Sequence, residues 1–177
     1  SVVHTVSEIA SVYESLRQKE KAYQMRESCL SLLREAHGIT SIAYYKGVHA
    51  LAACCWKFGD YQRGAELAEV LVHSLQGRYG AKHSLVAPAM VVLGLCRTNL
   101  GDFMQGEDML VRATSLAHGI WGKGHTDATD AAVGLAMLYE LRGSFELSEI
   151  SSNTSREDRE GRLGRWHHAS HQDAVNV

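Results

Sequence analysis

The 177-residue sequence contains only one proline, and aromatic residues make up just 7% of the chain. A typical chain of this length holds about nine prolines. Turn-rich all-β folds also use more of the aromatic residues that favour strands. The two shortages therefore argue against an all-β fold and favour a helical one.

The sequence also lacks an excess of charge of one sign and any long apolar run. Its formal net charge is −2, which gives no large positive field of the kind that nucleic-acid binding requires. No apolar run reaches the ~18–20 residues that cross a bilayer, and no signal-peptide pattern opens the chain. We therefore expect a cytoplasmic protein without a nucleic-acid or membrane partner.

The cysteines lack the C-x-x-C spacing of redox motifs and zinc sites. All four lie in apolar segments with helical periodicity, at Cys29, Cys54, Cys55 and Cys96. We expect reduced thiols that act as small core residues, as in an intracellular protein. A redox pair of Cys54 with Cys55 is the alternative, and a zinc site is not expected because such sites usually combine closely spaced ligand pairs.

What the sequence does contain is an internal repeat of 42 residues. A turn tripeptide recurs at this interval, at Gly59-Asp60-Tyr61, Gly101-Asp102-Phe103 and Gly143-Ser144-Phe145. Eight residues before each glycine stands an apolar residue followed by a small one, at Leu51-Ala52, Leu93-Gly94 and Leu135-Ala136. One period earlier, Ile9-Ala10 fits the second pattern, but Arg17 stands where the glycine belongs. A fixed period of this length is typical of repeat architectures.

Each repeat is predicted to be a pair of antiparallel helices. From about residue 84 to 100 apolar residues recur at helical spacing, a Gly-Asp turn follows, and the helical pattern resumes from 103 to about 120. Small residues are expected where the two helices of a pair cross, at Ala52 with Gly64 and at Gly94 with Gly106. The period predicts four units, over about residues 5–38, 41–79, 84–121 and 126–150.

The predicted helix ends carry their own signals. The expected N-caps of successive first helices are Ser41, Ser84 and Thr126. Gly80 and Gly122 are expected to end second helices in the αL conformation. Pro88 is a misfit, because it lies a few residues inside an expected helix and is tolerated only in the first turn.

A linker pattern of aromatic-Gly-x-x-His keeps the same period, from Tyr79 to His83 and from Trp121 to His125. Together with the turn glycines, this pattern resembles tetratricopeptide repeats. The 42-residue unit is similar to the repeats of kinesin light chains and to the C-terminal helical domain of SET-and-MYND-domain lysine methyltransferases. The resemblance covers about residues 5–150 and implies an all-α fold, a right-handed superhelix of antiparallel helical hairpins. It does not identify a partner, because such repeats serve many unrelated ones.

Residues 1–150 are accordingly expected to form the repeat array. Residues 151–177 mix charge, glycine and histidine without periodicity, and we expect them to be disordered. Repeat arrays normally finish with a polar capping helix, and no such helix is visible in the sequence. We therefore expect the array to continue in a longer protein or to be covered by a partner.

The resemblance places a bound peptide or helix on the concave side, which the first helices of the units line. The expected groove residues are Lys46, His49, Ala53, Trp56, Lys57, Val91, Leu95, Thr98, Asn99, Val133, Met137 and Glu140. The alternative is that Val91, Leu95, Val133 and Met137 simply pack against neighbouring helices. A shift of one position in the alignment of the repeats would move a residue from the groove into the core. The cations and Asn99 are too scattered to make the carboxylate clamp of chaperone-binding relatives.

The chain shows no pattern for catalysis or for holding a metal. It has no nucleophile elbow, no zinc-protease helix and no paired carboxylates in an apolar setting, so we expect neither enzyme activity nor a cofactor nor a small-molecule substrate. A histidine run at His167, His168 and His171 lacks acidic or thiol partners, so no metal site is expected there. His83 and His125 are interpreted as linker residues, because they follow the period.

The sequence thus predicts a non-catalytic interaction module that binds a peptide or helix of another protein. One alternative is a regulatory domain of a SET-type lysine methyltransferase, although the chain contains neither a SET core nor a MYND cysteine cluster. The other is a structural subunit of a cytoskeletal or ciliary assembly.

Overall fold

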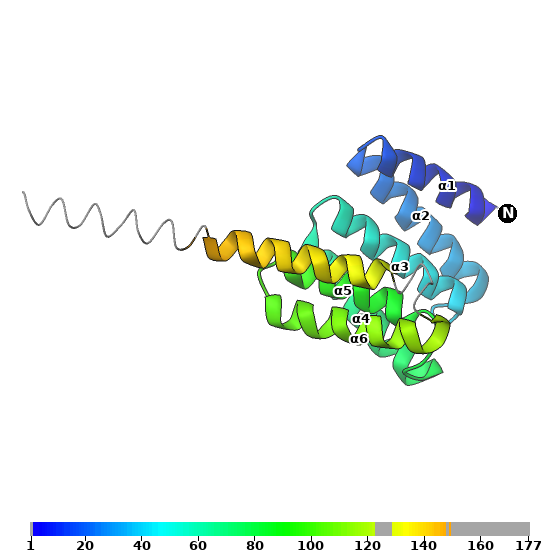
Figure 1. The fold of residues 1–177 in the computed structure, drawn as a ribbon. Coiled ribbons are helices and arrows are strands. Elements are labelled where there is room, and N and C mark those ends of the chain that lie inside the picture. The colour runs from blue at the N-terminus through cyan, green and yellow to red at the C-terminus, as the bar shows by residue number, and fades with distance from the viewer. Residues whose placement is uncertain (1, 123–128, 148, 150–177) are drawn as a thin grey trace, which may run out of the picture. The chain divides into compact units, whose positions relative to one another are not determined.

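A computed structural model of the chain describes residues 2–122, 129–147 and 149, and all regular structure in these residues is helical. The first six helices of these residues are α1 (Val2–Ser15), α2 (Lys19–His37), α3 (Ile42–Lys57), α4 (Tyr61–Tyr79), α5 (Val86–Asn99) and α6 (Phe103–Trp121). A further helix runs over residues 129–147. The chain divides into two compact units after Leu138, and the six helices belong to the first unit (Figure 1).

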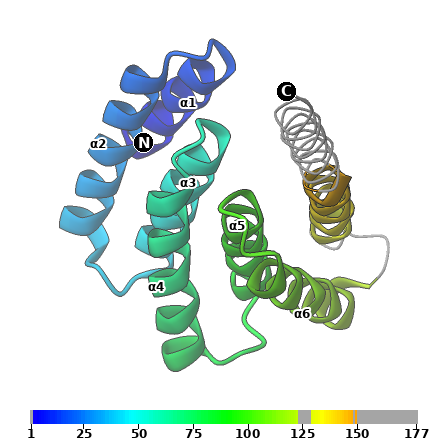
Figure 2. The ribbon, with the colours of Figure 1, turned by 90° about the vertical axis from the view of Figure 1, so that its left-hand side faces the viewer.

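Consecutive helices of the first unit pair as antiparallel hairpins. α1 packs on α2, α3 on α4 and α5 on α6, and successive hairpins pack through α2 with α3 and through α4 with α5. In Figure 2 the three hairpins follow one another from α1 to α6. The predicted all-α architecture of repeated hairpins is confirmed for these three hairpins. The turn predicted at Gly143-Ser144-Phe145 is wrong, because one helix continues from residue 129 through Gly143 to residue 147. The division into an array over 1–150 and a tail stays a prediction, since residues 151–177 lie outside the described residues.

The turns inside the hairpins explain the periodic glycine. Gly59 and Gly101 have φ angles of +79° and +86°, a backbone conformation that glycine adopts without steric cost. In the first hairpin Arg17 takes the same place with φ at +58°, and it is the one non-glycine residue with a positive φ in the described part of the chain. A side chain in this region costs about 1–2 kcal/mol, so the first turn carries strain that the later turns avoid.

We therefore expect Arg17→Gly to raise the free energy of unfolding by about 0.5–1 kcal/mol. The gain is smaller than the strain, because the Arg17 guanidinium donates a hydrogen bond to the Lys57 carbonyl oxygen at 3.2 Å. Urea denaturation measures the change. The control Arg34→Gly, at an exposed position within α2, should lose about 1 kcal/mol instead. A loss at both positions would contradict the strain assigned to Arg17.

One N-cap prediction is confirmed and one is wrong. The Ser41 hydroxyl oxygen accepts a hydrogen bond from the Tyr44 amide at 3.1 Å. Ser84, however, does not cap α5, because the helix begins at Val86 after Leu85. This later start places Pro88 in the first turn, where its missing N–H would have had no helical partner. Thr126 lies outside the described residues.

The glycines that end the second helices have positive φ but not the predicted αL conformation. Gly80 has φ +89° and ψ 159°, and Gly122 has φ +85° and ψ 170°. The Gly80 amide still donates to the Gln76 carbonyl oxygen at 3.0 Å, but the extended ψ then directs the chain away from the helix into the linker. Gly38 ends α2 in the same way, so this glycine also follows the 42-residue period.

The small residues do allow close helix contacts where the sequence predicts them. A Cβ atom on Gly94 would lie 2.7 Å from Leu110 Cγ and 3.1 Å from the Gly106 carbonyl oxygen. A Cβ atom on Gly64 would lie 3.3 Å from the Ala52 carbonyl oxygen. The 2.7 Å distance is too short for any relaxed side chain, and the other two are tighter than ordinary van der Waals contact, so glycine allows the close approach at each crossing.

The four cysteines are free and buried, as the sequence predicts. Burial raises the pKa of Cys54 to about 12 and that of Cys96 also to about 12. Both thiols therefore stay protonated near neutral pH and act as small apolar side chains.

Candidate partner-binding surface

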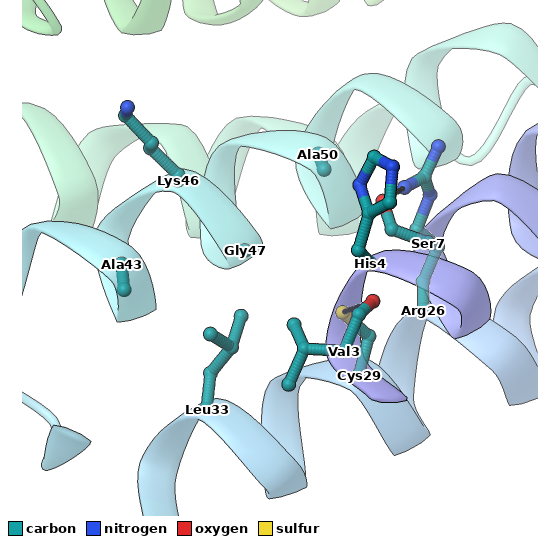
Figure 3. Close-up of a pocket in the computed structure, with 10 residues that line it drawn as sticks. All are labelled: Val3, His4, Ser7, Arg26, Cys29, Leu33, Ala43, Lys46, Gly47 and Ala50. Atoms are coloured by element: carbon teal, nitrogen blue, oxygen red, sulfur yellow. Dashed lines mark hydrogen bonds between the residues drawn. The ribbon is translucent and has the colours of Figure 1, made fainter. Parts of the chain in front are cut away.

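A pocket of about 300 Å³ opens between α1, α2 and α3 (Figure 3). It is lined by Val3, His4 and Ser7 of α1, by Arg26, Cys29 and Leu33 of α2, and by Ala43, Lys46, Gly47 and Ala50 of α3. Most of this lining is aliphatic or small. The pocket is therefore a largely apolar hollow, about the size of one side chain, on the surface that α1 and α3 form.

The charge at the rim of this pocket is positive. Lys46 is exposed, and it makes no ion pair within the part of the chain that the structure describes. α3 contains no acidic residue, so no carboxylate on its own helix neutralises this lysine. The His4 imidazole lies 3.2 Å from the Glu8 carboxylate on α1. Lys46 is thus a cation available to an acidic group beside the pocket.

Arg26 and Ser7, at one end of the pocket, belong to a buried ion network. One carboxylate oxygen of Glu14, Oε1, accepts a hydrogen bond from Arg26 Nε at 2.8 Å and lies 2.7 Å from Arg26 Nη2. The other, Oε2, accepts from Lys57 Nζ at 2.6 Å. Arg26 also donates to the Ser7 and Ser11 hydroxyls, each at 3.1 Å. The network joins α1, α2 and α3 and holds the two sides of the pocket together.

The balance of effects on Glu14 favours its ionised form. Burial raises the pKa of the Glu14 carboxyl, but the hydrogen bonds from Lys57 and Arg26, together with their charges, lower it by more. The pKa of Glu14 therefore lies below its usual value. The carboxylate is charged at neutral pH, as its two cationic partners require.

The predicted groove residues of α3 lie in three different environments. Lys46 lines the pocket. The Lys57 ammonium pairs with Glu14 and so belongs to the buried ion network. Ala53 and Trp56 are half-buried and pack against the core, and His49 is also half-buried.

In α5 the open groove predicted at Val91, Leu95 and Thr98 is closed. These side chains are buried, and a Cβ atom on Gly134 would lie 3.5 Å from Leu95 Cδ2. Helices of the neighbouring hairpins cover α5, which explains why its first-helix face is core. For Val91 and Leu95, burial agrees with the alternative that they pack against neighbouring helices. The Thr98 hydroxyl donates to the Gly94 carbonyl oxygen at 2.8 Å within α5.

The remaining predicted residues are more open. The Asn99 side chain is half-buried and donates to the Leu95 carbonyl oxygen at 2.8 Å. Val133 is exposed rather than packed, whereas Met137 packs against the core. Glu140 is exposed and belongs to the second compact unit. A role for these residues in partner binding stays a prediction.

A wider hollow, which the sequence reasoning missed, is lined mainly by α3 and α4, with Leu30 of α2 and the linker between α2 and α3. Its volume is about 650 Å³, and its lining includes Ile39, Tyr44, Leu67 and Val70. Ile39 and Val70 are more than half exposed. The available signal in the sequence was Val70, an apolar residue on the otherwise polar face of a second helix. Of its charged lining residues, Arg63 pairs with Glu27 and Glu66 accepts a hydrogen bond from Gln62.

Comparison with known proteins agrees with the fold. No protein-family profile and no curated protein matches the chain at the level of sequence. Among solved structures, a putative kinesin light chain from Podosopora anserina with nearly identical TPR-like repeats superposes with a TM-score of 0.69. The sequences are 17% identical, over 80% of this chain and 67% of that chain. The fold is that of tetratricopeptide-like repeats.

A second structural neighbour of this tetratricopeptide-like array is BtubC (BKLC) from P. vanneervenii. Its TM-score is 0.62 at 19% identity, over 92% of this chain and 65% of that chain. At such identities the likeness shows the fold alone. This chain spans about two thirds of the length of each neighbour.

Two further observations concern only the described residues of the tetratricopeptide-like array. No three histidine, cysteine or acidic side chains gather there as a metal site would need. None of the helices described has the length and apolar character to cross a membrane. The histidine run at 167–171 and His125 lie outside the described residues.

Proposed function

We propose that this chain is a non-catalytic interaction scaffold that binds a peptide or helix of another protein over α1 and α3. The observation that carries the proposal is the pocket between these helices, with its apolar walls and an unpaired lysine at the rim. The tetratricopeptide-like fold supports a scaffold role. The kinesin light chain description of one structural neighbour favours an adaptor. No feature of the described residues favours the methyltransferase alternative or a structural subunit of a cytoskeletal or ciliary assembly.

The chemistry of the pocket suits an apolar side chain followed by a carboxylate. A volume of about 300 Å³ is at the lower limit for small-molecule sites, so it fits one side chain better than a cofactor. An acidic group about 4 Å from Lys46 would gain roughly 1–4 kcal/mol of Coulomb energy between bulk water and a protein surface. The ligand is therefore a short segment with an apolar anchor and an acidic neighbour.

The test uses peptides selected from a displayed random library against the full chain, with affinities measured by titration calorimetry. Lys46→Glu should weaken the selected peptide at least about tenfold, which corresponds to 1.4 kcal/mol. Ala50→Trp should weaken it as well, because the indole fills the pocket. Lys82→Glu makes the same charge change at an exposed position in the linker between α4 and α5, and it should leave the affinity unchanged. Equal affinities for the Lys46 and Lys82 variants would refute the assignment of the pocket.

A further inference from the structure

The first helix carries an exposed apolar stripe that no described part of the chain covers. Val2, Ile9, Val12 and Leu16 are between 40% and 69% exposed, and they recur at the spacing of one helix face. We call these four residues the α1 stripe. Val3 and Ser7, which line the pocket described above, lie on a different face of α1. Single exposed apolar residues are common on soluble proteins, but a continuous stripe marks an interaction surface.

The 42-residue period shows which surface the α1 stripe corresponds to in the later hairpins. One period on, its positions are held by Tyr44, Leu51, Cys54 and Phe58, and two periods on by Val86, Leu93, Cys96 and Leu100. All of these are buried or half-buried except Leu100. The same column of side chains is therefore covered in α3 and in α5 but open in α1.

In both later hairpins the cover is the second helix of the preceding hairpin. α2 lies on α3, where the Tyr23 and Phe58 rings meet edge to face with centroids 5.9 Å apart. α4 lies on α5, where a Cβ atom on Gly64 would come within 2.8 Å of Cys96 Sγ. The α1 stripe occupies the equivalent column, and no helix of the described residues covers it.

We propose that the α1 stripe is the docking site of an amphipathic helix that lies antiparallel to α1, as α2 lies on α3. This occupant is the second helix of a further hairpin of the same kind. α2 and α4 show the side chains that it needs. Leu30 and Leu33 of α2 correspond to Val72 and Leu75 of α4, one period later. The docking helix therefore carries two aliphatic residues three positions apart. It also carries a smaller or an aromatic residue seven positions before the first of them.

The test adds such a helix to the full chain in the correct register. A second copy of residues 61–84 placed directly before residue 1 sets α4 at the same distance along the chain from α1 as it has from α5. We expect the fusion to raise Tm by about 5 °C or more and to reduce the binding of an apolar fluorescent dye. The matched control carries the same fusion on the Ile9→Lys/Val12→Lys variant, where it should produce no rise over the unfused double variant. Both substitutions are at exposed positions, so the variant is expected to fold.

Two results would overturn the proposal. One is a fusion that leaves Tm unchanged, or that raises it equally with and without the two lysines, since the added helix would then not lie on the stripe. The other is a dimer of the unfused chain in sedimentation velocity that the Ile9→Lys/Val12→Lys variant abolishes. Such a dimer would make a second copy the occupant, instead of a further hairpin.

Discussion

Glu14→Gln is expected to lower the free energy of unfolding by about 3–5 kcal/mol, the cost of breaking a buried ion pair by removing one partner. The Glu14 side chain is 5% exposed and that of Arg26 is 10% exposed. A neutral amide at position 14 would leave the Arg26 guanidinium buried without a counter-ion. It would also remove the ion pair between the Lys57 ammonium and α1. Urea denaturation followed by circular dichroism measures the loss.

The matched control is Glu27→Gln. Glu27 pairs with Arg63 at 2.6 Å, but both side chains are at least 40% exposed. Exposed pairs of this kind contribute between 0 and about 1 kcal/mol, so the control should be nearly as stable as the parent. Similar losses in the two variants would mean that the Glu14 network contributes no more than a surface pair.

The same network predicts a dependence of stability on pH. The folded pKa of Glu14 is lowered from a usual value of 4.5, so the folded state binds the proton more weakly than the unfolded chain. The stabilisation is therefore complete above pH 4.5 and is lost as the pH falls through the folded pKa. The stability difference between the parent and Glu14→Gln should shrink over this acidic range. A difference that stays constant with pH would contradict the ionised state assigned to Glu14.

Gly94→Leu is expected to lower the free energy of unfolding by about 3 kcal/mol, at the upper end for overpacking a well-filled interior. A Cβ atom at this position would meet both the Leu110 side chain and the Gly106 backbone. The side chain can move, but the Gly106 carbonyl belongs to α6, so α5 and α6 would have to separate. Thermal unfolding with the calorimetric enthalpy measures the loss.

Gly77→Leu is the control for Gly94→Leu. Gly77 is also helical, but a Cβ atom there has no neighbour within 4 Å. Leucine has a higher helix propensity than glycine, so this variant should gain up to about 1 kcal/mol. If Gly94→Leu were as stable as Gly77→Leu, the pairing of α5 with α6 through Gly94 and Gly106 would be wrong.

The repeat made the fold predictable because backbone requirements recur with the period. A turn that needs positive φ selects glycine at 59 and 101, and a crossing without room for Cβ selects glycine at 64, 94 and 106. Arg17 breaks the pattern of residues, yet its backbone adopts the same positive φ. The 42-residue period therefore holds for the backbone geometry even where the amino acid differs.

The ion network was not predictable from the period, because it replaces core residues in one hairpin only. Glu14 occupies the column that holds Trp56 and Thr98 in the later units, and Arg26 the column of Ala68 and Leu110. Two opposite charges at positions that are otherwise apolar or small were the available signal. Sequence alone does not show that their side chains meet, since that depends on the packing of α1 against α2.

The predicted groove positions of α3 and α5 differ in exposure for a physical reason. The repeat alignment treats the first helices as equivalent, but their surroundings differ. The helix over residues 129–147 adds to the cover of α5, since a Cβ atom on Gly134 would lie 3.5 Å from Leu95 Cδ2. Val91 and Leu95 are therefore buried, whereas His49 and Ala53, one period earlier, are half-buried. Burial in a short array depends on which helices flank a given hairpin, and the repeat period carries no information about that.

The most direct test of the interaction surface is chemical-shift mapping of a selected peptide on the isotope-labelled full chain. At 19.5 kDa the protein suits backbone amide spectra. We expect the largest shifts around Val3 to Ser7 of α1 and Ala43 to Ala50 of α3, and we expect Lys46→Glu to reduce them at the same peptide concentration. Shifts centred on Ile39, Leu67 and Val70, at the hollow over α3 and α4, would contradict this assignment.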